Sequence, residues 1–171
     1  MFVKRLIITV AVSLIAVSTY AQKNDFCDAV SAILKDAPNQ FRNIRNPNPE
    51  KGGQNSITYK SGINIPGTII SRFISSMGFF YEGALKQAKT PEGLKDDYEH
   101  YKTILNTCLE SKGYKMRLTP NYITGLENYK KVIFMPDFKA SATPPIGHVA
   151  LEVDFNKTSG MYTLIIYIFE K

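Results

Sequence analysis

Apolar residues recur at helical spacing in two separate stretches of the chain. The first stretch covers residues 25–37, and Pro38 ends it. The second begins at Thr90-Pro91-Glu92, where the threonine can cap a helix, the proline suits its first position and the acid favours its dipole. The pattern predicts two amphipathic helices. Their apolar stripes consist of Phe26, Val30, Ile33, Leu34 and Ala37 in the first, and of Leu94, Tyr98, Tyr101, Leu105, Cys108 and Leu109 in the second.

Most of the remaining chain has the two-residue period of β-strands or is rich in β-branched and aromatic residues. Three candidate strands follow one another between residues 55 and 87 and predict an antiparallel meander. Four more lie at residues 114–118, 131–135, 148–155 and 161–169. The last segment is apolar on both faces, which indicates an interior strand. We expect a single α+β domain, with an antiparallel sheet of five or six strands and both helices packed on one face.

The clearest alternation lies in residues 148–155. It predicts that one face of this strand is buried and consists of Val149, Leu151, Val153 and Phe155. The other face should be exposed and includes Glu152 and Asp154.

Residues 38–53 begin with Pro38, end with Gly53 and contain three prolines, four asparagines and two glycines. This composition predicts a loop, in which Asn46-Pro47-Asn48-Pro49 continues neither a helix nor a strand. A loop of this length inside a small domain is often functional or mobile, and the sequence leaves both possibilities open. Its basic and apolar cluster is a candidate partner contact, formed by Phe41, Arg42, Ile44 and Arg45.

The N-terminus has the layout of a secretory signal peptide. Two cations, Lys4 and Arg5, precede an apolar run of about 12 residues, which is shorter than the roughly 20 that span a bilayer. A small-residue site ends at Ala21, so we expect residues 1–21 to be removed and residues 22–171 to form the exported domain. A retained membrane anchor is the alternative. The expected location is periplasmic or extracellular.

Cys27 and Cys108 are the two cysteines of the chain. In an oxidising compartment such a pair is most simply a disulfide, here closing a loop of about 80 residues. The competing interpretation is a catalytic thiol, which needs a paired base. Neither of the two histidines, His100 and His148, has a local signature that ties it to a cysteine.

The net charge of the whole chain is +6, and removal of Lys4 and Arg5 with residues 1–21 lowers it to +4. This mild bias favours weak attraction to anionic surfaces. Besides the cluster in residues 38–53, basic and aromatic residues alternate in two places: Lys112, Tyr114, Lys115 and Arg117, and Tyr129, Lys130 and Lys131. Ordinary surface cations explain them. Among partners, an anionic glycan, a lipid headgroup or an acidic protein is favoured over nucleic acid, which we do not expect.

No motif for catalysis, for a cofactor or for a metal is present. His148, Glu152 and Asp154 share one strand face, but the span of about 20 Å from first to last lets only neighbours share an ion. A solvated outer face explains all three. We therefore assign no catalytic, cofactor-binding or metal-ligating residues.

The order of elements, a helix, three strands, a helix and further strands, resembles the small α+β domains of the type III secretion chaperone-like class. The strand Phe79-Phe80-Tyr81-Glu82, followed by Thr90-Pro91-Glu92 and a helix that ends near Cys108, also resembles small exported proteins of the Bacteroidota. The resemblance implies a fold and no site. Chaperones of that class are cytosolic, whereas this chain begins with an export signal.

The absence of a catalytic constellation and the ten tyrosines and ten phenylalanines favour an exported, non-enzymatic domain. We expect it to bind a protein, glycan or envelope component through its sheet or through residues 38–53. The alternative is a small envelope hydrolase with paired carboxylates among Glu82, Glu152 and Asp154. A purely structural envelope protein is the third possibility.

Overall fold

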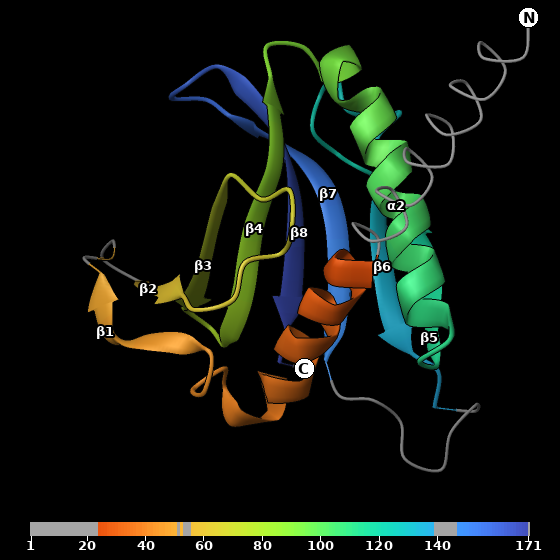
Figure 1. The fold of residues 1–171 in the computed structure, drawn as a ribbon. Coiled ribbons are helices and arrows are strands. Elements are labelled where there is room, and N and C mark those ends of the chain that lie inside the picture. The colour runs from red at the N-terminus through yellow and green to blue at the C-terminus, as the bar shows by residue number, and fades with distance from the viewer. Residues whose placement is uncertain (1–23, 51, 53–55, 139–146, 171) are drawn as a thin grey trace, which may run out of the picture.

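One antiparallel sheet of eight strands is the centre of the computed structural model, which describes residues 24–50, 52, 56–138 and 147–170. The strand order is β1-β2-β3-β4-β8-β7-β6-β5, so β1 and β5 form the two edges (Figure 1). The strands are β1 (Arg45–Glu50), β2 (Ile57–Ser61), β3 (Ile70–Ser75), β4 (Phe79–Ala88), β5 (Tyr114–Thr119), β6 (Lys131–Pro136), β7 (His148–Asn156) and β8 (Met161–Phe169).

The α+β class is confirmed, but the predicted count of five or six strands is too low. Each predicted strand segment joins the sheet, and β1 is added within residues 38–53, where a loop is predicted. The prediction misses β1 because Pro47 and Pro49 lack the N–H groups of a ladder. An edge strand tolerates proline where the missing N–H faces away from its neighbour. β1 is such an edge, and its register on β2 shifts between Arg45 and Pro49.

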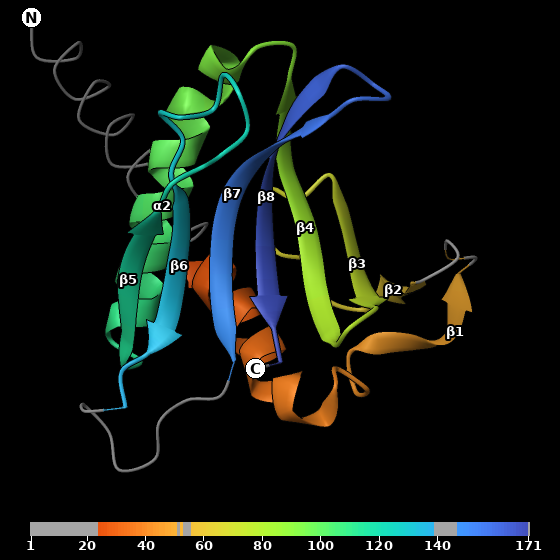
Figure 2. The same cartoon turned by 180° about the vertical axis from the view of Figure 1, so that it is seen from behind.

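Two helices cover one face of this sheet. The first occupies residues 24–36, and α2 (Lys95–Glu110) follows a 3-10 turn, η2 (Pro91–Leu94). Both lie in front of the strands in Figure 1 and behind them in Figure 2. Thr90 precedes the turn as predicted, but its side chain makes no capping hydrogen bond, and Leu94 occupies the N-cap position directly before α2.

The hydrophobic core fills the space between the helices and the sheet. Val149, Leu151 and Val153 of β7 belong to it and are at most 1% exposed, as the alternation predicts. The prediction is wrong for Phe155, which is half-buried. Phe155 lies near the end of β7, where its ring packs on that of Tyr162 of the adjoining strand with centroids 4.7 Å apart.

The predicted disulfide is confirmed. Cys27 in the first helix is bonded to Cys108 near the end of α2, with a Cα–Cα distance of 5.4 Å. The bond joins residues 81 apart in the sequence and fastens the two helices to each other on the same side of the sheet.

The chain leaves the first helix through a turn held by Asp36. One of its carboxylate oxygens accepts the N–H of Asn43 at 3.0 Å, and the other accepts the side-chain amide of Asn39 at 3.1 Å. Part of the predicted loop is therefore ordered before β1 begins, as η1 (Ala37–Asn39) and the turn that follows it.

The signal peptide predicted at residues 1–21 falls outside the described residues. In the part of the chain that is described, neither helix combines the length and apolar character required to cross a membrane.

Candidate functional site

The face of the sheet opposite the helices, called here the helix-free face, has no described helix over it (Figure 2). Strand β8 shows how the sequence divides the two faces. Its core side, packed beneath the helices, consists of Leu164, Ile166 and Ile168. The alternate residues lie on the helix-free face and are Thr163, Ile165, Tyr167 and Phe169. Strand pairing then aligns Phe80 of β4 and His148 of β7 on either side of Phe169.

Four rings on this face form a cluster, called here the aromatic patch: Phe80, His148, Tyr167 and Phe169. The His148 ring stacks on Phe169 with centroids 4.3 Å apart and planes 13° from parallel. Phe80 lies 5.5 Å from Phe169 and 5.9 Å from Tyr167. All four are half-buried, so each ring packs on its neighbours and keeps part of its surface at the solvent.

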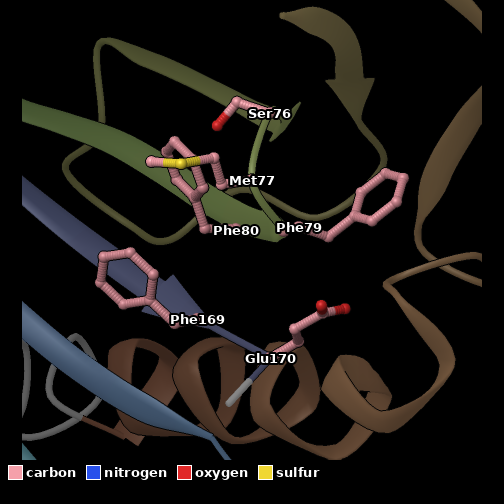
Figure 3. A pocket seen from close by; sticks show the side chains of 7 residues that line it. Ser76, Met77, Phe79, Phe80, Phe169 and Glu170 are labelled. Carbon is pink, nitrogen blue, oxygen red and sulfur yellow. The ribbon is translucent and has the colours of Figure 1, made fainter.

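A hollow of about 360 Å³, called here the end pocket, opens beside the aromatic patch. It lies where the turn between β3 and β4 meets the end of β8, and its lining is Ser76, Met77, Gly78, Phe79, Phe80, Phe169 and Glu170. Phe80 and Phe169 extend to one side of the strands and Phe79 to the other (Figure 3). Met77 is fully exposed, so an apolar side chain lies in solvent at this end of the strands.

Two ion pairs flank Tyr167 on the helix-free face. Arg72 holds Glu82 on the β4 side at 2.6 Å, and Lys131 holds Glu152 on the β7 side at 2.6 Å. Burial, followed by the charges of Glu82 and Glu152, raises the pKa of the Tyr167 hydroxyl above its ordinary value.

Two of the carboxylates proposed for hydrolysis, Glu82 and Glu152, do not converge. Glu82 lies on β4 and Glu152 on β7, with β8 between them, and each has its own cation. The expectation that Glu152 and Asp154 are exposed is wrong, since both are half-buried. The reason is that β7 has a neighbouring strand on either side, and Lys131 of β6 covers Glu152.

The four residues predicted as a partner contact do not share one surface. Phe41 is completely buried, Arg42 is exposed, and Ile44 and Arg45 are half-buried. The Arg45 guanidinium lies 4.1 Å from the ring centroid of Tyr59 and 4.4 Å from that of Phe79. Arg45 thereby fastens β1 to a residue of the end pocket.

Within the described residues, no group of three or more histidine, cysteine, aspartate or glutamate side chains could hold a metal ion. His148 is engaged with Phe169, and the His100 ring packs on Tyr101 with centroids 5.3 Å apart.

A second hollow, of about 380 Å³, lies beside the start of α2 and is lined by Glu92, Lys95, Tyr98, Glu99, Gly125, Asn128 and Tyr129. One lining residue has a structural role, because the Tyr98 hydroxyl donates a hydrogen bond to the Lys130 carbonyl at 2.6 Å.

The aromatic patch is not predicted by the sequence. Residues 161–169 are apolar on both faces, and this pattern by itself predicts only an interior strand. Which face the helices would leave open is decided by tertiary packing.

Comparisons with protein-family models, with curated proteins and with solved structures gave no match.

Proposed function

We propose that the protein is an exported binding domain without catalytic activity, and that its ligand binds at the aromatic patch and the end pocket. The single observation that carries the proposal is a cluster of half-exposed rings beside a hollow of about 360 Å³, on a sheet face without a described helix over it. Export rests on the sequence of residues 1–21, and the disulfide is compatible with it.

The patch has the physical properties of a binding surface. Aromatic rings bury a large area on contact and lose little conformational freedom, because each has only two side-chain torsions. Here the rings are fixed by mutual packing on paired strands, so they are already positioned for a ligand. Small-molecule sites have volumes from about 300 Å³ upwards, and the end pocket falls at the lower end of that range.

The lining indicates the class of ligand. Met77, Phe80 and Phe169 offer apolar surface, whereas Ser76 and Glu170 supply the polar groups. We therefore infer a ligand with a flat or apolar group, such as an aromatic ring or the apolar side chains of a partner protein. Hydrolysis is less well supported, because Glu82 and Glu152 are held by separate cations on strands that are not neighbours.

A fluorescent apolar probe, anilinonaphthalene sulfonate, tests this site. Phe80→Ala removes one wall of the end pocket, and we expect it to weaken dye binding by about tenfold, or about 1.4 kcal/mol. Met77→Ser should act in the same direction without affecting the fold, because Met77 is fully exposed. The measurement is a fluorescence titration of each purified variant.

Phe138→Ala is the matched control, since Phe138 is 71% exposed and does not line the end pocket. It should leave dye affinity unchanged. If Phe80→Ala and Met77→Ser bind the dye as tightly as Phe138→Ala does, the proposed site is wrong.

A further inference from the structure

The two edges of the sheet differ in their ability to accept another strand. At one edge, β1 contains Pro47 and Pro49, which have no N–H to donate. At the other edge, β5 contains no proline, and all six of its residues pair with β6. Figure 2 shows β5 at the border of the sheet, with α2 behind it. Of the two edges that the described strands form, β5 is therefore the one that offers an additional strand a continuous ladder.

The hydrogen-bond pattern shows which groups of β5 face outward. Antiparallel strands alternate between residues bonded to the partner and residues directed away from it. The Asp137 N–H donates to the Gly113 carbonyl at 2.8 Å, one step before the ladder begins. Gly113 is therefore directed towards β6, and so is every second residue after it. The N–H and C=O groups of the residues between them, including Met116 and Leu118, point away from β6. Two outward donors and two outward acceptors lie in a row there.

The side chains of β5 have a different character on each face. Lys115 and Arg117 pair with Met135 and Ile133, whose face is the helix-free one. The Lys115 side chain is 69% exposed although it contacts Asp137 at 2.7 Å. On the helix side, Met116 and Leu118 are 41% and 49% exposed. The strand thus presents cations on one face and unburied apolar side chains on the other.

These cations argue against a second copy of the chain as the occupant. In a two-fold antiparallel pair, residues of the same face stand opposite each other. In the registers centred near the middle of β5 the cations meet: one centred on Lys115 or on Arg117 places that cation against its own copy, and one centred on Met116 places Lys115 against Arg117. Like charges directly opposite each other destabilise strand pairing. The same cations attract a strand that carries carboxylates.

We propose that β5 accepts an extended segment of a partner protein as a ninth strand, and that this segment alternates acidic with apolar residues. The acidic residues lie opposite Lys115 and Arg117, and the apolar residues cover Met116 and Leu118. The backbone of the segment bonds to the outward groups of Met116 and Leu118. This interaction is independent of the aromatic patch, which lies on β4, β7 and β8.

A ten-residue peptide that alternates glutamate with valine is the probe. We expect it to bind the purified protein in a fluorescence-anisotropy titration, with an affinity that falls as salt is added. A peptide with lysine in place of glutamate should bind at least about tenfold more weakly, from the loss of paired charges. Methylation of the backbone nitrogens that face β5 should abolish binding, because it removes the donors of the ladder.

Arg117→Glu should weaken binding of the acidic peptide by about tenfold and improve binding of the lysine peptide. Lys157→Glu is the matched control: it makes the same change in net charge at an exposed site in the β7–β8 turn and should leave both affinities unchanged. Equal weakening by the two variants would mean that only net charge attracts the peptide and would overturn the proposal. Undiminished binding of the methylated peptide would also overturn it. So would a dimer in sedimentation that Met116→Pro abolishes, since the strand would then pair with a second copy.

Discussion

Phe41 shows how far the environment of one residue can depart from its local sequence. It lies among asparagines and arginines, which is why the sequence predicts a surface contact. The structure buries it completely, with its ring 5.0 Å from that of Phe73. Its φ of 58° lies in the left-handed region, which costs a bulky residue about 1–2 kcal/mol. Burying a phenylalanine contributes about 1.5–3 kcal/mol, so packing offsets this strain.

Truncation of this ring should therefore be costly. We expect Phe41→Ala to lower the free energy of unfolding by about 3–5 kcal/mol, because it leaves a cavity beneath the turn. Urea unfolding measures the change. Arg42→Ala, at the exposed neighbouring position, is the control and should change stability by no more than about 0.5 kcal/mol. A loss below about 1 kcal/mol for Phe41→Ala would contradict the buried position.

At the scale of elements, the helices and strands that the sequence predicts are those in which apolar residues recur at regular spacing. The first helix, expected at residues 25–37, is found at 24–36, and the strand expected at 161–169 is β8 without change. The sequence pattern does not predict β1, because Pro47 and Pro49 are unusual in a strand. The segment is a strand because it pairs with its neighbour β2 at the edge of the sheet. The sequence pattern also fails at Thr90, where a 3-10 turn intervenes before α2 and the predicted cap does not form.

The first helix and α2 are coupled by the bond between Cys27 and Cys108. Breaking it frees a loop that spans 81 positions in the unfolded chain. The chain-entropy model then gives a loss of about 4–5 kcal/mol as an upper value. We expect Cys27→Ser or Cys108→Ser to lower stability by a few kcal/mol in urea unfolding. The double variant serves as the control and should resemble either single one, because all three lack the same bond.

Thiol titration provides a second test of the disulfide between the two helices. Wild-type protein unfolded without reductant should show no free thiol, and each single variant should show one. Two free thiols in the unreduced wild type would contradict the bond and reopen the catalytic interpretation of Cys108.

For the whole molecule, the decisive feature is that both helices lie on one side of the sheet (Figures 1 and 2). The sequence predicts this two-layer arrangement from two amphipathic helices and one sheet, but it does not predict the candidate site. Phe80, Tyr167 and Phe169 come from strands about 80 residues apart that the fold makes neighbours. No local pattern distinguishes these rings from those of the core, since β8 is apolar on both faces.

The fold as a whole also removes tyrosine hydroxyls from water, which makes its stability sensitive to alkali. Burial raises the pKa of Tyr114 to about 12, and burial with the nearby charge of Glu99 raises that of Tyr98 to about 12. In the unfolded chain a tyrosine ionises near pH 10. Below pH 10 both states keep the proton, so the full stability is present. Between about pH 10 and 12 only the unfolded state releases it, and stability falls as pH rises.

Tyr114→Phe isolates this effect, because it keeps the buried ring and removes the ionisable hydroxyl. We expect the variant to lose less stability than wild type between pH 9 and pH 11, measured by urea unfolding at each pH. Tyr122→Phe is the matched control, since Tyr122 is 89% exposed and its ring is in water before and after unfolding. Lysine titration is common to both variants and cancels in the comparison. Equal losses in Tyr114→Phe, Tyr122→Phe and wild type would show that burial of Tyr114 does not link folding to alkaline pH.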